Sequence, residues 1–194
     1  IHGDITTDKN IDQSKIKAHL GNKVKSWITK DKFKKSDIDR IIHIVDMDGA
    51  YIDDKLIRFD ESCKDPFYSP VSIKTSNVEN IRLRNVQKRE NVDTLSTNTS
   101  GIYNGIPYKV YYMSCNLEHV LHDKLEDISE DEKKELANKF ADRFYEKEIE
   151  FIDFINNKDF KVLGDYKATW DFIKKDLNSV NRYSNFWLFF ENLK

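Results

Sequence analysis

Two aspartates separated by one residue follow a short apolar run in the first quarter of the chain. The run covers residues 41–45, is rich in β-branched side chains, and leads directly to Asp46, Asp48 and Gly49. This pattern predicts a strand buried on both faces, and ligands bind beyond the carboxyl ends of such strands in parallel sheets. Adjacent carboxylates repel each other unless a cation or hydrogen-bond donors offset their charge. The pair therefore predicts a Mg²⁺ or Mn²⁺ site, and a solvated turn is the alternative.

A second group of polar residues spans the end of another predicted strand and the start of a helix. Ser114, Asn116, Glu118 and His122 occur within eleven residues, 112–122. Glu118 and His122 are four residues apart and share one helix face. If the two strands are parallel neighbours, all four residues emerge beside the aspartates, with Glu118 as third metal ligand or base. The alternative is a helix-terminal charge interaction for Glu118 and a core position for His122. The zinc-protease spacing is absent.

The elements that must position these residues follow from hydrophobic spacing. We expect an opening strand at residues 1–6, an amphipathic helix at 14–30, and strands at 41–45 and 108–113. Strand, helix and strand in this order are typical of a parallel sheet. Residues 51–70 are expected to form a loop or a short antiparallel excursion, and residues 93–105 a surface loop.

A helix from Ser76 to about residue 90 carries the densest basic cluster of the chain. Ser76 is the expected cap, and Val78, Ile81 and Val86 are expected to face inward. The cluster is either a solvated face or a patch that binds a nucleic-acid backbone. Its members are Arg82, Arg84, Lys88 and Arg89.

The C-terminal third of the chain is expected to be mainly helical. Ser129 begins a capping box that opens a long helix to about residue 156, and a brief strand at 160–163 and helices at 169–175 and 183–193 follow. The last helix is aromatic and is expected to pack against the domain, a protein partner or a second copy. The predicted fold is α/β, a single domain with a mainly parallel sheet flanked by helices over residues 1–128 and a helical extension over 129–194.

Composition describes a globular protein with a heavily charged surface. Hydrophobic residues make up 39% of the chain and charged residues 34%, with 32 basic and 34 acidic side chains. This balance gives no bulk electrostatic case for nucleic-acid binding, so such binding would need a local patch.

No apolar run approaches the roughly 20 residues of a membrane span, and no signal peptide is visible, so we expect a cytoplasmic protein without membrane contact. Two separate cysteines indicate neither a disulfide framework nor a zinc site.

The sequence from Ile44 to Asp53 resembles the first motif of haloacid-dehalogenase-like phosphohydrolases. The resemblance implies Asp46 as nucleophile and Asp48 as general acid and base, and Ser114 would supply the second motif. The position of the motif differs, because a βα unit precedes it here and those proteins carry it near the N-terminus. The fourth, acidic motif would have to be Asp165 with Asp171, at a spacing that is too wide.

Residues 1–122 also resemble Toprim-related proteins of the RloB-like and OLD-type phage-defence group. In that group an Asp-x-Asp follows a strand reached through a βα unit, and a later segment resembles Ser114 to His122. The resemblance implies a Toprim-like core and a Mg²⁺ site completed by a Glu on an earlier strand. Asp4 is a poor substitute for that Glu. Because the chain opens on Ile1 without a methionine, we expect upstream sequence to supply it.

The favoured function is Mg²⁺- or Mn²⁺-dependent phosphodiester chemistry on nucleic acid, as in a nuclease of phage defence. Asp46 and Asp48 would hold the metal, Glu118 would be ligand or base, and the basic cluster would contact phosphate. The alternatives are a phosphohydrolase and a non-catalytic interaction module. We further expect that Asp to Asn changes at residues 46 and 48 leave the melting temperature unchanged or raised, and that burial raises the pKa of these carboxyls.

Overall fold

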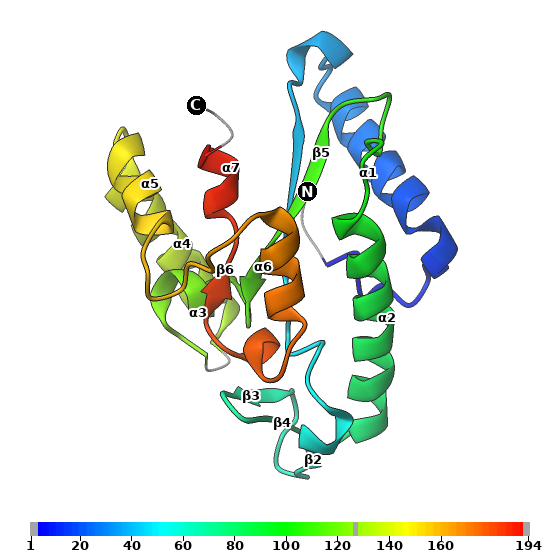
Figure 1. The fold of residues 1–194 in the computed structure, drawn as a ribbon, viewed down its shortest axis with the longest axis vertical. Coiled ribbons are helices and arrows are strands. Elements are labelled where there is room, and N and C mark those ends of the chain that lie inside the picture. Colours follow the sequence, from blue (N-terminus) through cyan, green and yellow to red (C-terminus); the bar gives the residue numbers. More distant parts are fainter. Residues whose placement is uncertain (1–3, 126–127, 192–194) are drawn as a thin grey trace.

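Two parallel strands form the centre of the sheet that leads to the predicted site. The computed structural model describes residues 4–125 and 128–191. In it β1 (Ile41–Asp46) lies parallel to β5 (Tyr108–Ser114), with Asp46 opposite Met113. The short strand β6 (Tyr183–Ser184) pairs antiparallel with the end of β5, which gives the strand order β1, β5, β6 (Figure 1). The parallel pairing on which the shared site depends is present, but this sheet has one parallel and one antiparallel pair and is therefore mixed, not mainly parallel as predicted.

One face of β1 is open, contrary to the prediction that both faces are buried. Ile42 and Ile44 are 36% and 41% exposed, whereas Val45 is only 3% exposed. Val45 belongs to the core shared with the two long helices before and after it, and β1 stands at the end of the strand order. A continuous apolar run therefore does not distinguish a strand covered on one face from a strand covered on both.

The part of the chain between β1 and the next long helix forms a second small sheet. It contains β2 (Ile57–Phe59), β3 (Phe67–Ser69) and β4 (Ser72–Thr75), with β4 in the middle. β3 pairs antiparallel with β4, and β2 pairs parallel with it. The expected antiparallel excursion over residues 51–70 is thus present as the strand β3 and its turn.

The helices α1 (Ile16–Lys30) and α2 (Val78–Ser96) lie side by side along one face of the sheet (Figure 1). α1 agrees with its expected position. α2 is capped by Asn77, not Ser76, because the Asn77 side chain accepts a hydrogen bond from the Asn80 amide at 3.0 Å. α2 also extends past residue 90, so residues 93–96 are helical and not part of a loop. Val86, predicted to face inward, is 39% exposed.

The expected opening strand is not formed by the residues that the structure describes. Residues 4–7 make a turn in which the Asp4 carboxylate accepts hydrogen bonds from the Thr6 amide at 2.8 Å and the Thr6 hydroxyl at 2.5 Å. Residues 1–3, the rest of that prediction, lie outside the described residues. An aspartate that bonds its own backbone two residues ahead favours a turn over a strand. The described residues also form four single-turn helices: Gln13–Lys15, Lys35–Asp37, Asp54–Leu56 and Asn178–Val180.

The C-terminal third is mainly helical as expected, but residues 183–184 of its last predicted helix form the strand β6, and its longest predicted helix is two helices. These are α4 (Glu130–Phe144), capped by Ser129, and α5 (Glu148–Ile155). Between them Glu146 has φ 55°, a left-handed conformation that ends a helix. The predicted strand at 160–163 is reduced to one bridge between Lys161 and Ser184. The other helices of this part are α6 (Tyr166–Ile173) and α7 (Trp187–Glu191), and α3 (Leu117–His122) precedes it directly after β5.

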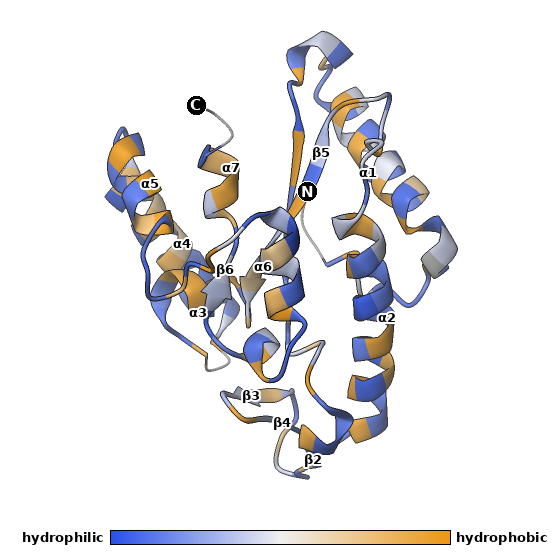
Figure 2. Cartoon of the chain, in the orientation of Figure 1, coloured by the Kyte–Doolittle hydropathy of each residue, from blue (hydrophilic) through white to orange (hydrophobic). Residues whose placement is uncertain are grey.

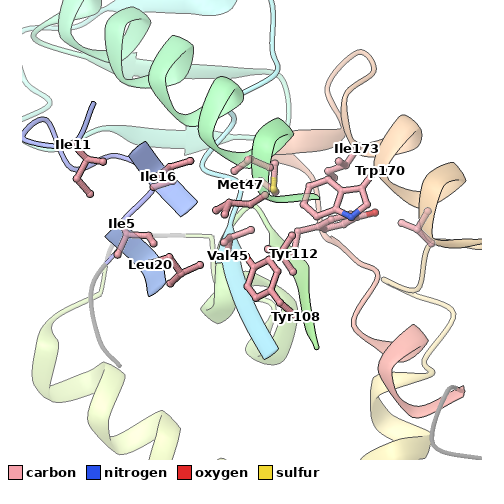
Figure 3. Close-up of a cluster of buried hydrophobic side chains, with 14 residues drawn as sticks. Ile5, Ile11, Ile16, Leu20, Val45, Met47, Tyr108, Tyr112, Trp170 and Ile173 are labelled. Atoms are coloured by element: carbon pink, nitrogen blue, oxygen red, sulfur yellow. The ribbon is translucent and has the colours of Figure 1, made fainter. Parts of the chain in front are cut away.

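Hydrophobic packing joins the C-terminal third to the sheet. Trp170 and Ile173 of α6 belong to the same core cluster as Val45 and Tyr112 (Figure 3). The aromatic C-terminal segment, residues 183–190, packs against β5 and α5, and Trp187 is only 5% exposed. Figure 2 shows hydrophobic residues, in orange, on both α5 and α7. The expected packing of this aromatic segment against the domain is therefore present. No described helix has the length and apolar character needed to cross a membrane.

Candidate active site at the acidic edge of the sheet

The two predicted groups of residues meet in one cleft. β1 and β5 end at the same edge, and a cleft of about 550 Å³ opens there, with Asp46, Asp48 and Glu118 in its wall. The amides of Met47 and Asp48 both donate to the Cys115 carbonyl, at 2.9 and 2.8 Å, and so tie the two strand ends together. The remaining lining residues are Asp65, Pro66, Tyr68, Asn116, Leu125, Ile128, Ser129, Glu130 and Lys133.

Asp46 is the carboxylate with the most strongly altered acidity. Burial raises the pKa of Asp46 to about 7, the negative charges of Asp48 and Glu118 add to the rise, and the Lys88 ammonium opposes it. This agrees with the expected effect of placing carboxylates together away from water. Asp46 can therefore gain or lose a proton near neutral pH, and a cation beside it would favour the charged form.

Asp48 is held more firmly than Asp46. Its carboxylate forms an ion pair with the Lys88 ammonium, and its carbonyl oxygen accepts a hydrogen bond from the Arg84 guanidinium at 2.7 Å. Its backbone has φ 48°, in the left-handed region that few side chains other than Asn and Asp adopt readily. The main chain and one carboxylate oxygen are thus both fixed.

Lys88 lies in an environment that its place in the basic cluster of the sequence does not predict. Its side chain is 0% exposed, and its ammonium lies 2.9 Å from the Asp4 carboxylate while it also pairs with Asp48. Burial by itself would lower the pKa of Lys88, but the two carboxylates outweigh burial and raise it. A buried ammonium cannot join a surface patch that contacts a nucleic-acid backbone. Asp4, considered only as a poor substitute for a Toprim Glu, is part of this cluster.

The other basic residues of α2 bind the turn after β1 or remain near the surface. Arg84 donates to the Tyr68 hydroxyl at 2.6 Å as well as to Asp48, and Arg89 donates to the Ala50 carbonyl at 3.0 Å. Arg82 is 3.8 Å from Glu79, and its side chain is 41% exposed. Neither a wholly solvated face nor a continuous phosphate-binding patch describes this cluster, because two of its arginines support the backbone of residues 48–50.

The residues after β5 take different roles around the cleft. Asn116 caps α3 by accepting a hydrogen bond from the His119 amide at 2.8 Å, which places Glu118 in the first turn of that helix.

The Ser114 hydroxyl donates to the Asn178 carbonyl at 3.1 Å, and neither Ser114 nor His122 lines the cleft. The His122 ring packs against Phe140 at 5.6 Å, and burial lowers the pKa of this imidazole. His122 is half-buried, so it lies at the edge of an aromatic cluster and matches neither the predicted site position nor the core alternative.

His119 lies closer to the strand-end turn than the histidine that sequence analysis selected. Its Nδ1 accepts a hydrogen bond from the Cys115 amide at 3.2 Å, and its side chain is 8% exposed. The one sequence signal for it was its position three residues after a capping asparagine. Because that bond stays within the β5–α3 junction, His119 stabilises the turn.

The described residues do not form a ready-made three-ligand metal site. Among them, no group of three or more His, Cys, Asp or Glu side chains is arranged to hold a metal ion. Mg²⁺ is usually bound by one or two carboxylates together with water and substrate oxygens, not by a full protein cage. The donor set of Asp46 and Asp48 fits that mode of binding, whereas the expected set of three carboxylate ligands is not preassembled.

A larger cavity lies at the opposite end of the strands. It has a volume of about 750 Å³ and is lined by the first residues of β1 and β5 and by Tyr166 and Trp170 of α6. Its wall combines aromatic and aliphatic side chains with polar and charged ones, and it does not contain Asp46, Asp48 or Glu118. We therefore place the candidate chemistry in the smaller acidic cleft.

Comparison of the chain with models of known protein families, with curated proteins and with solved structures finds no match. The resemblances to Toprim-related proteins and to haloacid-dehalogenase-like phosphohydrolases therefore stay predictions.

Gly49 shapes the turn that follows the aspartates, and this role can be tested by stability. It has φ 65°, and a Cβ there would lie 2.5 Å from Val180 Cγ1 and 2.7 Å from Ile73 Cδ1. Gly49→Ala should lower the free energy of unfolding by about 2 kcal/mol, because backbone strain and overpacking add. Gly105 has φ 70° with open space around it, so Gly105→Ala should cost only about 1 kcal/mol. Equal losses in urea titration would contradict the close packing around Gly49.

Proposed function

We propose that the acidic cleft hydrolyses phosphodiester bonds of nucleic acid with the help of one divalent cation, Mg²⁺ or Mn²⁺. The observation that carries this proposal is the meeting of Asp46, Asp48 and Glu118 in one cleft where the pKa of Asp46 is raised to about 7. Perturbed carboxyl groups that converge in a cleft are typical of catalytic sites. The RloB-like resemblance implies phage defence as the biological setting.

The charge of the cleft explains why a cation would be required. Five of its lining residues carry carboxylates and only one is a lysine, Lys133. A polyanionic substrate is repelled by such a surface unless a bound cation reverses the local charge. Asp46 and Asp48 would hold the cation, which when bound would supply charge neutralisation for the phosphate.

The protein side chains then have separate tasks. Asp48 is held rigidly by Lys88 and by its fixed backbone, so it keeps its position without the cation. Asp46 would hold the cation in its charged form, because a pKa near neutral pH lets this carboxyl lose its proton. Glu118, on a different element, accepts a proton from the attacking water. Arg82 has a partly exposed side chain but does not line the cleft, so it would contact only a phosphate bound outside the cleft.

The proposal is tested by incubating the purified chain with labelled single-stranded and duplex DNA and RNA. Cleavage is expected with Mg²⁺ or Mn²⁺ and should stop with EDTA. Beryllium fluoride should not modify Asp46, because the proposed chemistry forms no aspartyl-phosphate. Turnover of small phosphomonoesters without nucleic-acid cleavage would favour the phosphohydrolase. Neither activity, together with no cation-dependent shift in melting temperature, would favour a non-catalytic interaction module.

Glu118→Gln separates the two roles considered for this residue. If Glu118 is the base, cleavage should fall by about 100-fold while Mn²⁺ affinity stays within twofold of wild type. A large loss of Mn²⁺ affinity would instead assign Glu118 as a ligand. Glu130→Gln removes another cleft carboxylate, at the start of α4, and is the control for a general change in charge.

A further inference from the structure

The buried ammonium of Lys88 occupies a position between carboxylates that a metal ion would otherwise favour. It pairs with Asp4 and Asp48, and its positive charge is close enough to Asp46 to lower the pKa of that carboxyl against the stronger effect of burial. The side chain is 0% exposed, so water does not compete for the ammonium. Three carboxylates thus interact with one internal cation.

The surroundings of Lys88 are organised to keep it there. Asp4 is itself fixed by hydrogen bonds from the Thr6 amide and hydroxyl. The pKa of Asp4 is lowered because the Lys88 charge and these hydrogen bonds outweigh the effect of its burial. Two-metal phosphodiester sites place their ions about 3.5–4 Å apart around a shared carboxylate. Here Asp48 is the shared carboxylate, with Lys88 on one side and the cleft on the other.

We propose that Lys88 is a built-in cation that takes the place of a second metal ion, so that the cleft binds one divalent ion and not a pair. This inference rests on the proposed divalent-cation site and concerns its stoichiometry. Asp48 would share its carboxylate between the ammonium and the bound ion. Asp4 acts as a positioning residue, because it holds the ammonium at the inner side of Asp48.

Counting bound Mn²⁺ tests this inference without any activity measurement. Electron paramagnetic resonance of free Mn²⁺ in titrations of the full chain should give one ion per chain for the wild type. Lys88→Met removes the charge but keeps the length of the side chain, and should bind a second ion or bind the first at least tenfold more tightly. Adding Asp4→Asn to Lys88→Met should abolish the second ion. Lys133→Met, which removes a charge from the cleft rim, should still bind one ion.

The outcomes separate this inference from the proposed function. No Mn²⁺ binding by the wild type would overturn the divalent-cation site and the inference with it. One ion in both wild type and Lys88→Met, with equal affinity, would overturn the inference and leave the site standing, as would two ions in the wild type. If Lys88→Met does not fold, Lys88→Gln keeps hydrogen-bond donors without the charge. It should then bind Mn²⁺ at least tenfold more tightly than wild type, and unchanged affinity would overturn the inference.

Discussion

Asp48→Asn is expected to lower the free energy of unfolding by about 3 kcal/mol, which corresponds to a fall in melting temperature of about 6–12 °C. The change leaves the Lys88 ammonium, which is 0% exposed, with Asp4 as its remaining ion-pair partner. Removing one partner of a buried ion pair is costly because the other charge stays away from water. This corrects the expectation from sequence that both aspartates can become asparagine without loss of stability.

Asp46→Asn is the matched comparison, since it removes a carboxylate two residues away. Because burial and like charges raise the pKa of Asp46, its charged form is unfavourable in the folded state. Asp46→Asn should leave the melting temperature at pH 7.5 unchanged or raise it, and should abolish stabilisation by Mg²⁺ or Mn²⁺. Differential scanning fluorimetry with and without cation measures both effects. Similar stability losses for the two variants would contradict the assigned pairing of Lys88 with Asp48.

The second large effect is a dependence of the free energy of unfolding on pH, which arises from the Asp46 carboxyl. The pKa of this carboxyl is about 7 in the folded protein, compared with 3.8 for an ordinary aspartate. A raised pKa means that the folded state holds its proton longer, so this contribution to stability is fully present below pH 3.8 and is lost as pH rises to about 7. The loss should amount to about 2–4 kcal/mol.

The contribution of Asp46 is isolated by measuring the unfolding free energies of wild type and Asp46→Asn against pH in EDTA and subtracting one curve from the other. The unfolding free energy of Asp46→Asn minus that of wild type should increase between pH 4 and about pH 7 and then level off, because titration of the other groups cancels. Saturating Mn²⁺ should remove the increase by favouring the charged carboxylate. A difference that stays constant from pH 4 to pH 8 would show that Asp46 is not perturbed.

Several local features of the fold are predictable because their causes lie within a few residues. The helical spacing of Ile16, Leu20, Val24 and Ile28 predicts α1, and these four side chains are buried in the structure. Ser129 predicts the start of α4 because its side chain satisfies the Glu132 amide. The positions at which one helix ends and the next begins are less predictable. The separation of α4 from α5 depends on a left-handed conformation at Glu146, a residue type that does not signal one.

The candidate site likewise has residues that can be predicted from the sequence and one residue whose environment cannot. Asp46, Asp48 and Glu118 can be selected from sequence because carboxylates after predicted strands mark a sheet edge. The environment of Lys88 cannot, because Arg82, Arg84, Lys88 and Arg89 are similar basic residues on one helix. Which of them points inward depends on how α2 lies against β1 and against the turn at Asp4.

The sequence by itself determined the two main strands, the position of α1, the start of α4 and which carboxylates follow the strands. Local spacing, capping and turn chemistry act within about four residues, so the chain carries that information directly. Only the tertiary structure decided that β1 lies beside β5, that one face of β1 is open, and that Asp4 and Asp48 enclose the ammonium of Lys88. These features join residues up to 84 positions apart, and they arise because a buried charge is stable only where packing brings opposite charges to it.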